Sequence, residues 1–238
     1  MRKVKKFKLT SEFIVDISGV KLFRIKALIE FGNVKAGDLG GYIEKEENLS
    51  HMGDAWVSDD ARISGNAQVF GNAQVFGDAQ VFGDAWVFGN ARVSGNAQVS
   101  GDAQVFGDAQ VFGDTQVFGD AWVFGNAWVS GNARVFGDAQ VSGNARVSGN
   151  ARVSGDAQVF GDARVSGDKD YAYAHGFGSC NRTTTFFRLK DGDVGVRCGC
   201  FYGTLAQFRD KVCETHGETK KAQEYLMLAD LMEIRFKN

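Results

Sequence analysis

The sequence of 238 residues predicts an all-β solenoid, a parallel β-helix built from hexapeptides, with a different fold at each end. The first observation is an unbroken period of six residues from Gly53 to Ser166, which gives 19 hexapeptides of the form G-[DN]-A-x-V-[FS]. The second is the composition, with 31 glycines, 20 phenylalanines and no proline. The third is the loss of the period at both ends. These limits predict three regions, an N-terminal β capping module (1–52), the β-helix (53–168) and a C-terminal α+β domain (169–238).

Each hexapeptide is expected to form one side of a triangular coil. Side chains alternate along a strand, so Ala and Val of each repeat face the interior, while the variable Gln, Arg or Trp and the following Phe or Ser face outward. Gly and the next Asp or Asn form the corner, because they adopt tight conformations at little cost. Three hexapeptides complete a coil. Residues 83–88 recur at 119–124, two whole coils later, which supports this register.

This register gathers two ladders along one edge of the rod. The phenylalanine ladder, which Trp86 and Trp122 flank and Ser142 interrupts, consists of Phe70, Phe88, Phe106, Phe124 and Phe160. The aspartate ladder, at the corner that leads into the same side, consists of Asp84, Asp102, Asp120, Asp138 and Asp156. An aromatic face of this size favours self-association, so these aromatic residues are the expected interface of a homotrimer or homodimer. Carboxylates about 4.8 Å apart repel one another. We therefore expect the aspartate ladder to bind cations, to take up protons, to meet basic groups of a partner subunit, or to be solvated.

The N-terminal region reads as a short β module. Residues 23–29 alternate in polarity, and the glycines within residues 37–41 predict turns. A solenoid needs its open strand edge covered, so this module is expected to be a cap.

The C-terminal region reads as a ββαα domain of about 60 residues. Residues 183–189 and 193–198 flank a Lys-Asp-Gly turn, which predicts a hairpin. Thr204 and Gln207 form a capping box that begins a helix, and Gly217 ends it. A second helix is expected to contain Tyr225, Leu226, Leu228, Leu231 and Ile234.

Charge and composition argue against nucleic-acid and membrane partners. The net charge is -2, and the repeat region alone carries -6, so the chain lacks the basic surplus of a nucleic-acid-binding protein. No apolar run approaches the roughly 18 residues of a membrane span, and the basic start lacks the apolar stretch of a signal peptide. We therefore expect a cytoplasmic protein with no nucleic-acid or membrane partner and no cofactor. The four cysteines, all in the last 59 residues, are expected to be free thiols.

Candidate ligand-binding residues lie in the C-terminal region. They are polar or thiol-bearing side chains near the end of the repeat: His175, Ser179, Thr183, Thr184, Thr185, Arg188, Cys198, Cys200 and Tyr202. The threonines and Arg188 could bind an anion or nucleotide, or the threonines could simply pair across strands. Cys198 and Cys200, with Cys213 and His216, offer the N and S ligands of zinc, but the spacing also suits buried thiols that act as small hydrophobes.

Both ends and the repeat together resemble phage and bacterial hexapeptide-repeat proteins. The residues that carry the resemblance are KLFRIKALIEFGNVKAGDLGGYIEKEENLSHMGDAWV at 21–57 and GSCNRTTTFFRLKDGDVGVRCGCFYGTLAQFRDKV at 178–212. The resemblance implies a left-handed β-helix and a phage or prophage origin. Proteins of this kind are often called putative acyltransferases, which implies a trimer, an acyl-CoA donor and a histidine as general base.

The repeat itself favours a non-catalytic function. Its 19 hexapeptides contain neither an extruded loop nor a histidine, so His175 is the candidate base if the chain is an acyltransferase. We therefore expect a binding protein that uses the β-helix as an oligomerisation scaffold and the C-terminal domain to recognise a host protein or a small signalling molecule. The alternatives are an acyl-CoA-dependent acyltransferase and a structural component of a virion.

Overall fold

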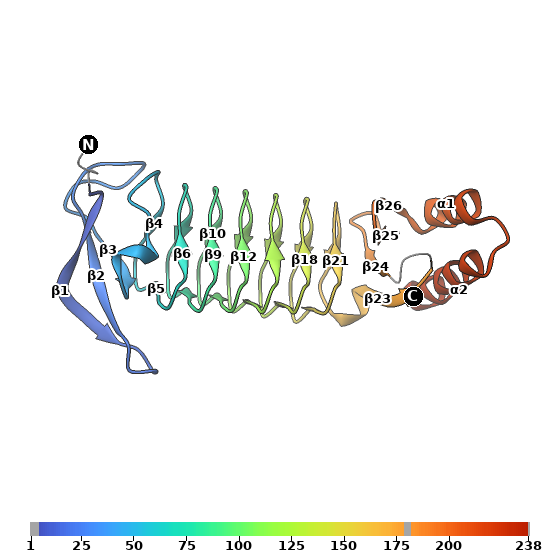
Figure 1. Ribbon diagram of the computed structural model, residues 1–238, viewed down its shortest axis with the longest axis horizontal. Helices are drawn as coiled ribbons and strands as arrows, with labels where there is room; N and C mark the ends of the chain where they lie inside the picture. Colours follow the sequence, from blue (N-terminus) through green and yellow to red (C-terminus); the bar gives the residue numbers. More distant parts are fainter. Residues whose placement is uncertain (1–4, 179–181, 238) are drawn as a thin grey trace.

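The computed structural model describes residues 5–178 and 182–237 and shows an elongated molecule (Figure 1). Its centre is a parallel β-solenoid of about seven turns, with a β-hairpin at the N-terminal end and an α+β domain at the C-terminal end (Figure 1). The fold class predicted from the hexapeptides is therefore confirmed.

Three sheets form the sides of the solenoid. The nine-stranded sheet has the order β1 (Phe7–Val15), β2 (Lys21–Ala27), β3 (Leu39–Ile43), β5 (Arg62–Ile63), β8 (Gln80–Val81), β11 (Gln98–Val99), β14 (Gln116–Phe118), β17 (Arg134–Phe136) and β20 (Arg152–Val153). The seven-stranded sheet contains β4 (Trp56–Val57), β7 (Gln74–Val75), β10 (Arg92–Val93), β13 (Gln110–Val111), β16 (Trp128–Val129), β19 (Arg146–Val147) and β22 (Arg164–Val165). The six-stranded sheet contains β6 (Gln68–Val69), β9 (Trp86–Val87), β12 (Gln104–Val105), β15 (Trp122–Val123), β18 (Gln140–Val141) and β21 (Gln158–Val159).

The repeat sequence sets both the interior and the corners. Strands pair in parallel with an offset of 18 residues, as Val105 with Val123. The alanines and valines of the hexapeptides are at most 1% exposed, which confirms their predicted inward orientation. The repeat glycines have φ between +59° and +80°, the left-handed conformation that the corner requires. Asp59 replaces glycine at one corner and adopts φ +56°, and its carboxylate accepts a hydrogen bond from the Gly77 amide at 3.0 Å.

The solenoid is polar along its axis. The N–H groups of the variable residue, of the following Phe or Ser and of the corner Asp or Asn donate to carbonyls of the next coil, as Trp56 to Ala73 at 3.0 Å and Trp86 to Ala103 at 2.9 Å. For this set of bonds the first coil leaves carbonyl groups open at the N-terminal end, and the last coil leaves N–H groups open at the C-terminal end. Buried backbone groups without partners are costly, so one end needs donors and the other needs acceptors.

The N-terminal cap supplies the donors. On one side, β3 adds a strand to β5, and on the next the Ser50 amide donates to the Val69 carbonyl at 2.9 Å. The Asn48 side chain, which the 3-10 helix Glu46–Asn48 positions, donates to the carbonyls of Gly65 and Ala67 at 3.1 and 2.8 Å. The cap thus continues the solenoid register with a mixture of backbone and side-chain donors.

Gly37 lies in a turn with φ +100°, as expected, but Gly40 and Gly41 lie inside β3, which corrects the expectation of turns at these two positions. A Cβ on Gly40 would lie 2.5 Å from the Val57 carbonyl, and one on Gly41 would lie 2.6 Å from the Ala61 carbonyl. These two glycines therefore allow β3 to pack closely on the first coil.

The C-terminal cap supplies the acceptors. The Asp168 carboxylate accepts a hydrogen bond from the backbone N–H of Arg152 at 2.8 Å. The Thr185 hydroxyl accepts one from the backbone N–H of Gln158 at 2.8 Å. Asp170, in the 3-10 helix Asp168–Asp170, accepts from the Ser166 amide and hydroxyl at 2.9 and 2.6 Å. Burial raises the pKa of Asp170, but these hydrogen bonds outweigh it and hold the pKa below its usual value.

The C-terminal domain contains four strands rather than the two expected. An antiparallel sheet has the order β23 (Tyr171–Phe177), β24 (Arg182–Arg188), β25 (Val194–Cys198) and β26 (Phe201–Thr204). The helices α1 (Leu205–His216) and α2 (Lys220–Phe236) follow. The predicted hairpin, the capping box and the helix stop at Gly217 are present. Gly176 in β23 and Gly203 in β26 interrupt the two-residue alternation, so the hydrophobic pattern did not predict these two edge strands.

Strand β24 joins the two halves of the molecule. Phe187 belongs to the solenoid core, whereas its neighbour Phe186 belongs to the core that α1 and α2 cover. The second helix buries Tyr225 and Met232, but Leu231 and Ile234 are 55% and 71% exposed. One face of the sheet therefore closes the solenoid and the other carries the helices.

Candidate functional site

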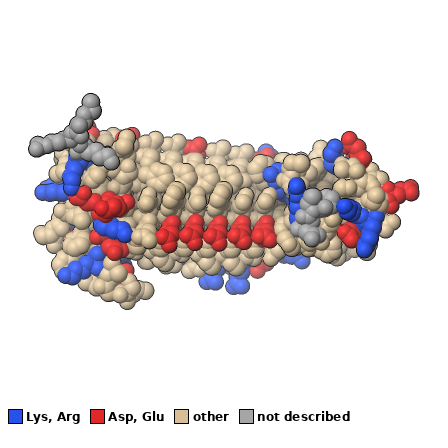
Figure 2. Space-filling view, in the orientation of Figure 1, with Lys and Arg blue, Asp and Glu red and all other residues tan. Residues whose placement is uncertain are grey.

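The aspartate ladder carries charge that its own corner does not compensate. Its five members are exposed, and Figure 2 shows a continuous row of acidic groups along the solenoid. At the other two corners asparagine amides bridge to aspartates, as Asn96 to Asp114 at 2.8 Å and Asn90 to Asp108 at 3.0 Å. At the corner of the aspartate ladder, an asparagine donates in this way to the first member, from Asn66 to Asp84 at 3.0 Å. The row therefore presents a strip of negative potential on one edge of the rod.

The ring faces of the phenylalanine ladder pack against one another. The rings of Phe70, Phe88, Phe106 and Phe124 stack at centroid distances of 4.8, 4.8 and 4.9 Å, with planes within 5° of parallel. Stacking leaves each of these rings only partly exposed. The exposed part of this side is consequently ring edges together with the indoles of Trp86 and Trp122, which are 42% and 39% exposed.

A groove lies between the two ladders near the N-terminal cap. It has a volume of about 360 Å³ and combines two carboxylates with an indole and side-chain amides: Asn66, Gln68, Asp84, Trp86, Asp102 and Gln104. An ammonium or guanidinium group is the chemical partner that carboxylates and an aromatic face share.

The last carboxylate of the aspartate ladder meets the C-terminal domain. His175 Nδ1 lies 2.9 Å from the Thr183 hydroxyl and 3.5 Å from an Asp156 carboxylate oxygen. Because one nitrogen makes both contacts, this arrangement is not a relay in which histidine passes a proton between a nucleophile and a carboxylate. The contact brings together the aspartate ladder and the candidate ligand-binding residues of the C-terminal domain, which the sequence analysis identified separately.

Thr184 and Thr185 hold the domain together. Both are at most 1% exposed. Thr184 donates to the sulfur of Cys198 at 3.2 Å, and Thr185 accepts the Gln158 amide. These two hydroxyls, expected to bind a ligand, are therefore buried and bonded within the protein. Ser179, another expected ligand-binding residue, lies outside the described residues.

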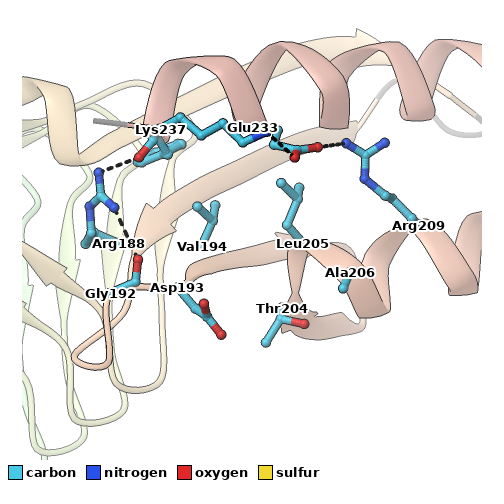
Figure 3. A pocket seen from close by; sticks show the side chains of 11 residues that line it. Arg188, Gly192, Asp193, Val194, Thr204, Leu205, Ala206, Arg209, Glu233 and Lys237 are labelled. Atoms are coloured by element: carbon cyan, nitrogen blue, oxygen red, sulfur yellow. Dashed lines mark hydrogen bonds and ion pairs between the residues drawn. The ribbon is translucent and has the colours of Figure 1, made fainter.

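Arg188 lines a cavity of about 330 Å³ between the sheet and the ends of the two helices (Figure 3). Its guanidinium donates to the carbonyls of Phe236 and Gly192 at 3.0 and 3.2 Å, so it fastens the end of α2 to the hairpin (Figure 3). Arg209 in the same cavity pairs with Glu233 at 2.8 Å. The cations of this cavity therefore already have partners within the chain.

Tyr202 and Cys200 have different surroundings. The Tyr202 ring packs edge-on against Phe160 at 5.0 Å, so it covers the end of the phenylalanine ladder. Cys200 is exposed and, with Cys198, lines a mainly apolar cavity of about 210 Å³ against α1. Arg182 and Lys211 also line this cavity.

In the described part of the chain, no three His, Cys, Asp or Glu side chains are arranged to hold a metal ion. This includes Cys198, Cys200, Cys213 and His216, the set that suggested zinc. Across residues 5–178 and 182–237, neither helix has the length and apolarity needed to cross a membrane.

Sequence reasoning missed Lys6 and Asn48, which are at most 1% exposed and bind carbonyls at the N-terminal end. The available signal was the open edge of the first coil, whose free carbonyl groups require donors.

The comparisons with known proteins concern the solenoid. The YdcK beta solenoid repeat family matches residues 61–76, 85–101, 127–143 and 139–155. No curated protein matches the chain. The central part of this protein is therefore similar to the YdcK beta solenoid repeat.

Proposed function

We propose that this protein is a non-catalytic binding protein whose solenoid is a scaffold for self-association and whose C-terminal domain recognises a partner. The observation that carries the proposal is the aspartate ladder beside the partly exposed aromatic side, on a rod without an extruded loop. A phage or prophage origin and a cytoplasmic location belong to the same proposal, and a host protein is the expected macromolecular partner.

The acyltransferase alternative is less well supported by the surroundings of His175. Acyl-CoA carries several phosphate charges, and the aspartate ladder ends at His175. Repulsion between these anions would weaken binding of the donor. We expect no acetyl transfer from acetyl-CoA to protein or small amines. Turnover that His175→Ala abolishes, while the unfolding curve stays the same, would overturn the proposal.

The cavity beside Cys198 supports recognition of a small molecule by the C-terminal domain. Its apolar lining and the cations Arg182 and Lys211 fit a compact ligand with an apolar body and one anionic group. Benzoate is a suitable probe. We expect benzoate to shift the amide resonances of α1, and Lys211→Ala to weaken this binding while the exposed control Lys220→Ala does not. Shifts absent at millimolar benzoate would contradict this part of the proposal.

A further inference from the structure

The arginines of the repeat are segregated by side. The outward positions of the six-stranded sheet hold only glutamine and tryptophan, namely Gln68, Trp86, Gln104, Trp122, Gln140 and Gln158. All six repeat arginines lie on the other two sheets: Arg62, Arg92, Arg134, Arg146, Arg152 and Arg164. The aspartate ladder therefore has the repeat arginines on one of its two adjacent sides, the nine-stranded sheet, and on the opposite side, the seven-stranded sheet.

Within the described residues, none of the six repeat arginines forms an ion pair. Arg134 and Arg152 are directly paired in β17 and β20 and are both exposed, so two guanidinium groups project from adjacent strands. In the same described part of the chain, neither of these two side chains contacts an aromatic ring. By contrast, Arg92 lies over the Phe76 ring at 5.3 Å and Arg146 lies over Trp128 at 4.7 Å.

Arg134 and Arg152 lie at the same level along the rod as two members of the aspartate ladder. Arg134 precedes Asp138 by four residues, and Arg152 precedes Asp156 by four, so each arginine shares a coil with one aspartate. The aspartates occupy the corner where the nine-stranded sheet meets the six-stranded sheet. Two stacks of like charge, opposite in sign, thus extend from the same coils in different directions.

We propose that the aspartate ladder of one copy docks against Arg134 and Arg152 of a second, parallel copy. This inference rests on the proposed scaffold function and specifies its interface. A rotation axis parallel to the rod keeps every residue at its own height. The arginines of one copy then face Asp138 and Asp156 of the next without any adjustment of register.

The triangular cross-section determines how many copies close the ring. Seen from the axis of a three-sided rod, a corner and the centre of an adjacent side differ in direction by roughly 60°, the angle between the two neighbours of a subunit in a ring of three. The acidic corner and the arginine side are adjacent in this way. The contact is heterologous and closes with three copies, whereas a contact with the opposite side would extend as a filament.

The N-terminal hairpin supports the same interface. Strands β1 and β2 continue the sheet that carries Arg134 and Arg152, and their tip projects beyond the rod (Figure 1). The projecting residues Phe13, Val15 and Ile17 are 46%, 56% and 108% exposed. In parallel copies these apolar tips lie at one level beside the neighbouring subunit, which would bury them.

The experiment is the mass in solution of charge-reversed full-length chains, measured by light scattering. Arg134→Glu with Arg152→Glu should shift the protein from trimer to monomer and weaken assembly by about 100-fold or more, because like charges then face each other. The matched control, Arg92→Glu with Arg146→Glu, changes the same charge on the seven-stranded sheet and should remain trimeric. Melting curves verify that both variants fold.

Adding Asp138→Arg and Asp156→Arg to the first variant exchanges the two signs and should restore the trimer. A trimer that survives Arg134→Glu with Arg152→Glu, or a failure of the exchanged variant to reassemble, would overturn the inference. The self-association proposal fails separately, if the wild-type chain is a monomer. If only Phe106→Ser with Phe124→Ser dissociates the assembly, the solenoid is still a scaffold for self-association, but its interface is the phenylalanine ladder. This result would overturn the charge-based interface.

Discussion

The ammonium nitrogen of Lys6 lies 2.6 Å from the carbonyl oxygen of Ala55, in a side chain that is 1% exposed. The same nitrogen lies 3.2 Å from the Gly53 carbonyl and 4.6 Å from the centre of the Phe31 ring. Both carbonyls belong to the segment that leads into β4, the edge strand of the seven-stranded sheet. Lys6 therefore provides at this side the donors that β3 and Asn48 provide at the others.

Removal of the Lys6 ammonium should destabilise the N-terminal end. Lys6→Met keeps most of the aliphatic volume but leaves two carbonyls without a donor, so the free energy of unfolding should fall by about 1–3 kcal/mol. Urea denaturation measures this change. The control Lys5→Met breaks an exposed ion pair with Glu46 and should cost less than about 1 kcal/mol. Equal effects of the two substitutions would contradict the capping role of Lys6.

The same lysine should make stability depend on alkaline pH. Burial, partly opposed by the charge of Asp54, lowers the pKa of Lys6 from 10.5 to about 8. Between these values the unfolded chain holds a proton that the folded protein has released, so stability rises with pH. We expect the wild type to gain about 2 kcal/mol relative to Lys6→Met between pH 8 and 10. A constant difference across this range would show that the pKa of Lys6 is ordinary.

Thr185 should be as important at the opposite end. Thr185→Val preserves the shape of the side chain but removes the acceptor for the Gln158 amide, which should cost about 1–3 kcal/mol in urea denaturation. The neighbouring hydroxyl of Thr183 lies at the surface junction with His175, so Thr183→Val should cost less than about 1 kcal/mol. The reverse order would mean that Thr185 does not cap the solenoid.

Thr115 occupies a position that alanine fills in the other hexapeptides, and its buried hydroxyl has no hydrogen-bond partner among residues 5–178 and 182–237. Thr115→Val removes this unsatisfied group at constant volume, so the melting temperature should rise, with a gain of about 1 kcal/mol. A lower melting temperature would indicate that the hydroxyl has a partner in solution.

The sequence predicted the repetitive part of the fold because one six-residue rule repeats without interruption. Ala and Val at fixed positions determine the interior, and glycine determines the corners. The caps were harder to predict, because single residues far apart in the chain provide each contact. Lys6 reaches Ala55, and Thr185 reaches Gln158, with no periodic signal in either pair.

The candidate site was predictable in part for the same reason. The two ladders follow directly from the register, and the stacked rings of Phe88 and Phe106 lie as that register requires. The threonine run could not be interpreted from sequence alone. Whether Thr185 binds a ligand or an amide of the last coil depends on how β24 packs on the solenoid.

In the proposed trimer the rods assemble side by side in parallel, through opposite charges at equal heights. The most direct test is the mass of the unmodified full-length protein by light scattering, first at low ionic strength and then in about 1 M salt, where the screening length falls to about 3 Å. We predict three chains at low salt and dissociation towards single chains at high salt. A single-chain mass at low salt and micromolar concentration, or a salt-independent dimer, would show that the rods do not assemble in this way.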